Sequence, residues 1–114
     1  MGETLFSKII RKEIPADIVY EDEHCIAFRD INPQAPTHVL VIPRRRIVNI
    51  AAMADDDVEA IGHLFLAARN TARALGVDQD GYRLVINNGA EVGQTVFHVH
   101  VHLLAGRALG WPPG

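Results

Sequence analysis

Residues 97–105 read Phe-His-Val-His-Val-His-Leu-Leu-Ala, a run in which apolar side chains alternate with imidazoles. Successive side chains of a β-strand point to opposite faces of the sheet, so this pattern predicts a strand over 97–105. The apolar members of the run would face a core, and the imidazoles would share the opposite face. The first set is Phe97, Val99, Val101 and Leu103, and the second is His98, His100 and His102.

Packing alone does not readily explain a row of imidazoles on one face of a strand. A buried imidazole needs a hydrogen-bond partner, and an exposed sheet face gains little from histidine. The row therefore favours chemistry over structure. His24 and His63 stand alone in the sequence, and we interpret each as structural or solvent-facing.

A metal site is the main alternative for this strand, because His-x-His can place two nitrogens on one zinc ion. Alternate residues of a strand lie roughly 6.7 Å apart, so His98 and His102 would lie about 13 Å apart and could not easily share an ion. A catalytic zinc would need a further ligand from His38, Cys25 or a carboxylate. We predict that the chain uses neither a metal nor another cofactor.

Gly93-Gln94-Thr95 comes directly before the histidine run. Glycine lets the backbone approach a ligand closely, and backbone amides, a glutamine amide and a threonine hydroxyl can surround phosphate oxygens. The tripeptide is a weak signal alone, but its position ahead of three aligned imidazoles indicates phosphate chemistry.

The rest of the chain predicts an α+β fold with five strands in a mainly antiparallel sheet, one long helix and a short N-terminal helix. Apolar residues at helical spacing before Pro15 predict the short helix, and two prolines make 30–36 a shaped loop. The strands expected besides 97–105 are Ile18–Tyr20, His24–Phe28, His38–Ile42 (ended by Pro43) and Tyr82–Asn87.

The long helix is expected over Asp55–Leu75. Its acidic first turn would cap the helix and complement the helix dipole, and Gly76 would end it. One apolar stripe would cover a face of the sheet; its members are Val58, Ile61, Leu64, Phe65, Ala68, Ala72 and Leu75.

Composition sets outer limits on function. The chain has 114 residues, 48% of them hydrophobic and 22% charged, which fits one domain over 1–114. A net charge of −3 disfavours binding of nucleic acid polymers, and the basic run Arg44-Arg45-Arg46 is interpreted as a solvated turn. A single cysteine and the lack of a long apolar stretch suggest a cytoplasmic protein that does not enter membranes.

The sequence resembles the histidine-triad (HIT) family, whose signature is His-φ-His-φ-His-φ-φ with φ apolar, here residues 98–104. Further similarity to the Hint branch covers essentially the whole chain. It lies in Phe6–Pro15, in Phe28–His38 and in the ending from Gly106-Arg107 to Trp111-Pro112-Pro113-Gly114. The resemblance implies a HIT-like fold and a purine nucleoside phosphoramidase that acts on AMP-like nucleotides.

The resemblance also implies roles for single residues. His100 would be the nucleophile, with His38, His98 and His102 completing the polar site. Asp30 would bind the ribose hydroxyls, and Arg29 stands near the base where histidine is common in the family. Leu5, Phe6, Ile9, Phe28, Ile31 and Leu40 would enclose the purine, and Asn87, Gly93, Gln94, Thr95 and His102 would hold the phosphate. The branch forms homodimers with one continuous sheet, in which segment 106–114, bearing Trp111, reaches toward the partner's site.

Three questions stay open at this level. A dinucleoside polyphosphate hydrolase of another HIT branch would share the nucleophile, although the ending and the short length argue against it. A nucleotide-binding regulatory protein with incidental catalysis is the other alternative. The proton needed by a departing amine could come from a neighbouring imidazole, with a relay through His102 favoured, or from the basicity of the phosphoramidate itself.

Overall fold

The computed structural model describes residues 3–114, in which one antiparallel sheet carries two helices. The strands follow the order β1-β2-β3-β5-β4, and each pairs antiparallel with its neighbour. The elements in chain order are α1 (Leu5–Ile10), β1 (Ile18–Glu21), β2 (Cys25–Arg29), β3 (Thr37–Pro43), the 3-10 turn η1 (Asp55–Asp57), α2 (Val58–Ala74), β4 (Arg83–Val85), the 3-10 turn η2 (Ala90–Val92) and β5 (Val101–Ala105). The α+β class, the five antiparallel strands and the two helices are confirmed.

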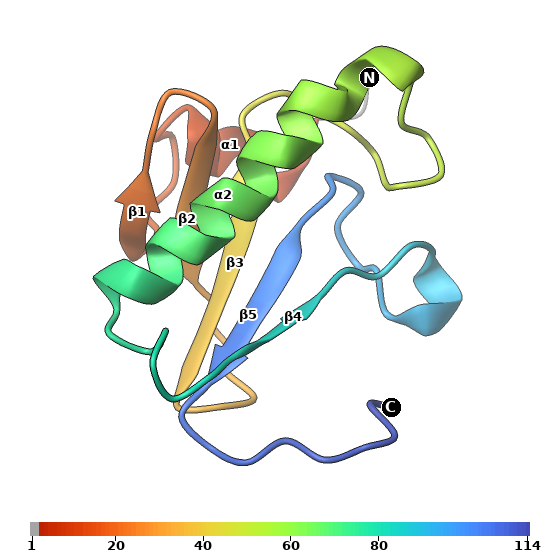
Figure 1. The fold of residues 1–114 in the computed structure, drawn as a ribbon. Coiled ribbons are helices and arrows are strands. Elements are labelled where there is room, and N and C mark those ends of the chain that lie inside the picture. Colours follow the sequence, from red (N-terminus) through yellow and green to blue (C-terminus); the bar gives the residue numbers. More distant parts are fainter. Residues whose placement is uncertain (1–2) are drawn as a thin grey trace.

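The sheet has a hydrophobic core on each face, because the strands alternate. In β3, Val39 and Val41 join the core beneath α2, while Leu40 and Ile42 join a smaller core beneath α1. In Figure 1 the long helix α2 crosses one face of the sheet and α1 lies behind β2. Since α1 has only 6 residues, it covers only part of its face.

Helix α2 turns a slightly different face to the sheet from the one that the sequence predicted. Its buried residues are Leu64, Ala67, Ala68, Thr71 and Ala72, at steps of three and four. The prediction was wrong for Val58 and Phe65, which are 71% and 42% exposed. Phe65 follows Leu64 by about 100° around the helix and so lies on its flank, while the small alanines let α2 sit close to the strands.

The acidic turn before α2 is only partly as predicted. Asp55–Asp57 form η1 rather than the first α-helical turn, and Asp57 makes no side-chain cap bond to the helix. Its carboxylate instead accepts a bond from the Ala54 backbone N–H at 2.9 Å and pairs with Arg45 at 2.9 Å. The carboxylate therefore fixes the entry to the helix.

The histidine strand begins four residues later than the alternation predicted, at Val101. Pro43 ends β3 and has no N–H, so the ladder cannot extend to the residues before Val101. Val99 N–H donates instead to the Ile47 carbonyl at 2.6 Å. Phe97 is 40% exposed rather than in the core, but Val99 still faces the core beneath α2. Strand β4 is likewise shorter than the predicted 82–87.

The two isolated histidines pack on each other beside the end of β3. The His24 and His63 rings lie 3.5 Å apart between centroids and are 8° from parallel, so they join the start of β2 to α2.

Of the helices in residues 3–114, none is long and apolar enough to cross a membrane.

Candidate active site

Four imidazoles gather on the sheet face that α1 leaves partly open. The pairing of β3 with β5 places Leu40 opposite His102, so His38 and His102 are diagonal neighbours on one face. The Phe6 ring of α1 packs edge-to-face with the other two imidazoles. The Phe6 ring centroid lies 6.0 Å from that of His98 and 5.1 Å from that of His100. Strand pairing and α1 together hold the cluster in place.

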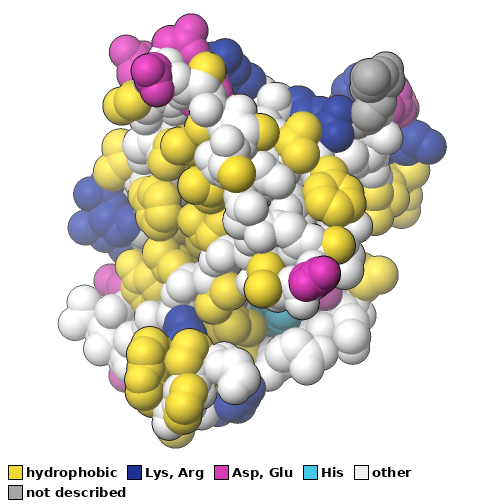
Figure 2. Space-filling view, turned by 90° about the vertical axis from the view of Figure 1, so that its right-hand side faces the viewer, with side chains coloured by type: hydrophobic (Ala, Val, Ile, Leu, Met, Phe, Trp, Pro, Cys, Tyr) yellow, Lys and Arg dark blue, Asp and Glu magenta, His cyan; other side chains and the backbone are white. Residues whose placement is uncertain are grey.

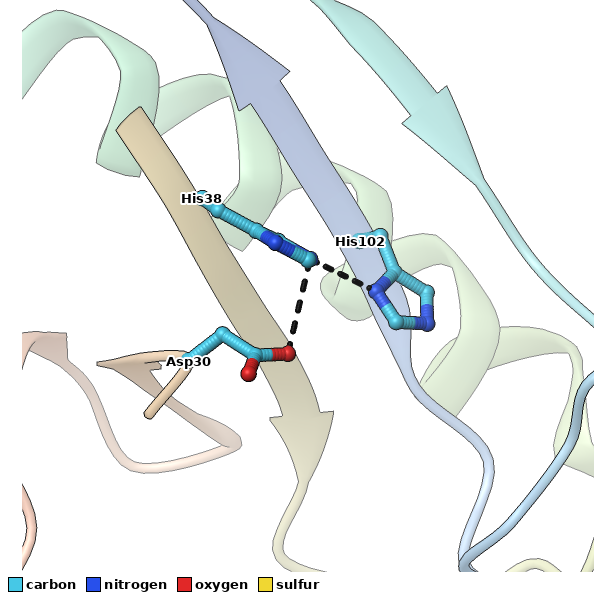
Figure 3. A group of neighbouring side chains, drawn as sticks. All are labelled: Asp30, His38 and His102. Atoms are coloured by element: carbon cyan, nitrogen blue, oxygen red, sulfur yellow. Dashed lines mark hydrogen bonds and ion pairs between the residues drawn. The ribbon is translucent and has the colours of Figure 1, made fainter. Parts of the chain in front are cut away.

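Hydrogen bonds fix the tautomer of His38. The Gln34 backbone N–H donates to His38 Nδ1 at 3.0 Å, so a neutral His38 carries its proton on Nε2. That nitrogen lies 2.9 Å from His102 Nδ1 and 3.5 Å from Asp30 Oδ2, as Figure 3 shows. His38 thus donates to His102, and a neutral His102 presents its own N–H at Nε2.

His100 has the opposite arrangement. Its Nδ1 lies 2.8 Å from the His98 carbonyl, which can only accept, so Nδ1 carries the proton and Nε2 keeps its lone pair. The His98 ring is held in turn by a bond from its Nε2 to the Pro43 carbonyl at 2.7 Å. His98 therefore positions the carbonyl that fixes His100, and His100 presents an unprotonated nitrogen suited to nucleophilic attack.

Burial keeps these imidazoles neutral. His38, His98 and His100 are buried, and burial lowers the pKa of each. Burial, reinforced by the neighbouring imidazoles, lowers the pKa of His102 to about 4. Asp30 opposes the shift at His38, His100 and His102 but does not cancel it. The nucleophile needs no deprotonation at neutral pH.

These lowered pKa values predict a loss of stability in mild acid. The unfolded chain gains protons on its histidines below about pH 6.5 while the folded protein resists them, so the free energy of unfolding falls as the pH drops toward 4. We expect a loss of about 1–2 kcal/mol between pH 7 and pH 5 from the His102 shift. Urea unfolding at the two pH values measures it, and His102→Gln should show a shallower dependence; an equal slope would contradict this assignment.

A cavity of about 500 Å³ opens beside the histidines, between α1, the end of β2 and the middle of β3. Its lining includes every residue predicted to contact the nucleoside, namely Leu5, Phe6, Ile9, Phe28, Arg29, Asp30, Ile31 and Leu40. Ile14, Pro15, Ala16 and Asp17 also line it and were not predicted. The chain after α1 carries no chemical motif, so only the return of the chain toward β1 places these four residues at the cavity.

The loop before β5 is shaped by its glycine. Gly93 has φ +112°, and a Cβ there would lie 3.3 Å from Asn87 Nδ2. Gln94 does not offer its side-chain amide to a ligand as the sequence suggested. Its Nε2 donates to the Val48 carbonyl at 2.7 Å, and its Oε1 accepts from Gly89 N–H at 2.9 Å. Thr95 is exposed, so its hydroxyl is the more accessible group.

Trp111 lies away from the cavity in the single chain. Its side chain is 81% exposed, and Arg83 of β4 lies over its ring at 5.9 Å from the centroid. Trp111 is not among the residues that line the nucleoside cavity. The C-terminal segment runs past the β4 side of the molecule, as Figure 1 shows.

One group in residues 3–114 brings metal-ligating atoms together, and it consists of Asp30, His38 and His102, whose ligand atoms lie within 4.8 Å of one another. The hydrogen bonds do not suit an ion at this place. His38 Nδ1 is occupied by the Gln34 N–H, and its Nε2 carries the proton donated to His102. An ion would have to displace that proton, because metal ligands must be deprotonated.

Comparison with known proteins points to one family. A family model described as HIT domain matches residues 11–109. The chain is 59% identical over 112 residues to an uncharacterised HIT-like protein of Synechocystis sp., covering 98% of this chain and 97% of that protein. It is 51% identical over 113 residues to a 14 kDa zinc-binding protein of Zea mays, covering 97% and 88% respectively. A crystal structure of a HIT family hydrolase from Legionella pneumophila Philadelphia 1 superposes with a TM-score of 0.94 at 49% identity, covering 98% of this chain and 100% of that one.

Proposed function

The chain belongs to the HIT domain family, and from this premise we propose that it is a nucleotide hydrolase of the Hint branch. Its substrate would be a purine nucleoside phosphoramidate, from which it releases the nucleoside monophosphate. The observation that carries the proposal is the unprotonated Nε2 of His100, fixed by the bond from Nδ1 to the His98 carbonyl. The similar Legionella protein, described as a hydrolase, supports the same class of reaction.

In the proposed first step, His100 Nε2 attacks the α-phosphorus while the bond from phosphorus to the leaving nitrogen breaks. The leaving amine must depart protonated. A pKa of about 4 and an Nδ1 occupied by His38 make His102 a hydrogen-bond donor rather than a proton source. The structure thus favours a substrate nitrogen that takes its proton from solvent before attack over a relay through His102. The His102 Nε2–H would offset charge on a phosphoryl oxygen.

In the second step, water attacks the phosphorus of the nucleotidyl-His100 intermediate. Because His100 Nδ1 keeps its proton, the ring leaves as a neutral imidazole and the site returns to its starting state. Water loses one proton to solvent, and the nucleoside monophosphate departs. We propose that Asp30 holds the ribose, that the apolar cavity lining encloses the purine, and that Asn87, Gly93 and Thr95 surround the phosphate, with Gln94 holding their loop.

The test is turnover of adenosine 5′-phosphoramidate alongside diadenosine polyphosphates. We expect the phosphoramidate to be the better substrate and expect mass spectrometry of quenched enzyme, under conditions that preserve acid-labile P–N bonds, to find the nucleotide on His100. Preincubation with a chelator should leave the rate unchanged. An adduct on another residue or chelator-sensitive turnover would refute this mechanism, and a preference for the dinucleotide would move the protein to another HIT branch.

We also propose that two copies pair through β4 into one continuous sheet. Strand β4 is an edge of the sheet, so one side of it is free to pair. Figure 2 views the side on which β4 and η2 lie and shows hydrophobic side chains spread over this face; Val92 and Trp111 are 65% and 81% exposed. Sedimentation equilibrium should give twice the mass of the chain. A monomer at micromolar concentration would contradict the pairing.

The single cysteine, buried in the core, is consistent with a reducing cytoplasm.

A further inference from the structure

A smaller cavity, of about 220 Å³, is lined by residues of α1 and of the turn after β3. Three guanidinium groups and an imidazole line it, and no carboxylate does: the lining residues are Ser7, Ile10, Arg11, Arg44, Arg46 and His98. The basic run, interpreted from the sequence as a solvated turn, also contributes to this cavity. Its first and third arginines meet at this cavity, while Arg45 pairs with Asp57 instead.

The three guanidinium charges are not equally compensated. Arg11 binds Glu3 and Glu13, at 2.6 and 2.7 Å. Arg44 binds Glu21 at 3.0 Å, a carboxylate that Lys12 also contacts. Arg46 donates to the neutral carbonyl of Phe97, from Nη2 at 2.8 Å and from Nε at 3.3 Å, and it has no carboxylate partner within residues 3–114. Arg46 thus leaves a positive charge at the cavity that an anion can balance.

His98 adds a second requirement. It is 1% exposed, and its Nδ1 is a buried nitrogen that has no hydrogen-bond partner within residues 3–114. Because Nε2 carries the proton donated to Pro43, Nδ1 of the neutral ring is an acceptor. A buried acceptor without a partner is unusual, and a ligand with a hydroxyl group would satisfy it.

We propose that this cavity binds an oxyanion of the hydrogen-phosphate class, with its charge on Arg46 and Arg44 and its P–OH donated to His98 Nδ1. Because this nitrogen is buried, the ligand must move a neighbouring side chain to reach it. The ligand chemistry follows from the two requirements together, because hydrogen phosphate has both a negative charge and a hydroxyl donor. Sulfate has the same size and shape but no O–H at neutral pH. The cavity shares no lining residue with the nucleoside cavity, although one of its own residues, His98, also positions the carbonyl that fixes His100.

Two sources could supply such a group, namely free inorganic phosphate and the terminal phosphate of a nucleotide. Titration of the isotopically labelled protein at low ionic strength, followed by NMR of the Arg46 side-chain N–H and the His98 ring, distinguishes them. Free phosphate as the ligand predicts saturable shifts that persist when AMP fills the nucleoside cavity. A nucleotide's terminal phosphate as the ligand predicts the same shifts on titration with AMP or ADP, and competition of either nucleotide with free phosphate.

Selectivity and substitution complete the test. We expect phosphate to bind at least about threefold more tightly than sulfate, and Arg46→Gln to weaken phosphate binding by about tenfold, as loss of a charge-assisted hydrogen bond predicts. Arg46→Lys, which keeps the charge, should lose less. Arg73→Gln, an exposed arginine near the end of α2, removes the same charge elsewhere and should change nothing. Equal affinity for sulfate or equal weakening in Arg73→Gln would each overturn the proposal.

Discussion

Replacing His100 with alanine should lower the turnover of adenosine 5′-phosphoramidate by about ten-thousand-fold, because the substitution removes the atom that attacks phosphorus. Nucleotide affinity should change by less than about threefold, since the His100 ring contributes little to holding the ribose and base. The cavity that would take the nucleoside is lined by other residues, and His100 is not one of them. Single-turnover kinetics and titration with AMP measure the two quantities separately.

The matched control for this variant is His24→Ala. It removes an exposed imidazole of the same chain that stacks on His63 of α2 and does not belong to the four-imidazole cluster, so turnover should stay within about twofold of wild type. A His100→Ala protein that hydrolyses the phosphoramidate at the normal rate would show that another group attacks phosphorus. Equal losses in both variants would indicate damage to the fold rather than loss of a nucleophile.

Local patterns in the sequence account for the framework of the site. Alternation along 97–105 put Val99 and Val101 on the opposite face from His100, and this holds even though the ladder starts only at Val101. Face alternation depends on backbone geometry within a few residues, so one sequence reveals it. The start of the ladder depends on Pro43, which is distant in sequence and lacks the N–H that pairing needs.

Proton positions could not be read in the same way. The tautomer of His102 depends on His38, 64 residues earlier, and the ring of His98 depends on the Pro43 carbonyl, 55 residues earlier. The sequence suggested Gln94 as a phosphate ligand, but its amide is used by backbone groups of two other segments. Spacing shows which residues share a face, but lone pairs are directed by long-range contacts.

The loop over 30–36 connects the strand framework to the proton positions of the imidazoles. Gly106 limits the position of this loop. The Gln34 N–H sets the tautomer of His38, and Arg107 donates to the Gln34 carbonyl at 3.0 Å. Gly106, directly after β5, has φ +96°, and a Cβ there would lie 2.8 Å from Pro36 Cβ and 3.1 Å from its Cγ. A proline ring cannot rotate away, so any larger residue at 106 must push the loop.

Gly106→Ala should therefore lower the free energy of unfolding by about 2–4 kcal/mol, through backbone strain at positive φ and overlap with the proline ring. Turnover should fall by about tenfold or more in the protein that remains folded, because displacement of Gln34 loosens the proton arrangement of His38 and His102. Urea unfolding measures the first effect, and kinetics at a temperature where the variant is folded measure the second.

Gly110→Ala provides the comparison within the same segment. A Cβ at Gly110 would meet no heavy atom within 4 Å, and its φ is not in the left-handed region, so stability and turnover should stay near wild type. Wild-type stability in Gly106→Ala would mean that the loop yields freely. A destabilised variant with full activity would mean that the position of Gln34 does not control the imidazoles. Only losses of both stability and turnover, confined to position 106, fit a site whose proton positions are set by the contact between the end of β5 and the 30–36 loop.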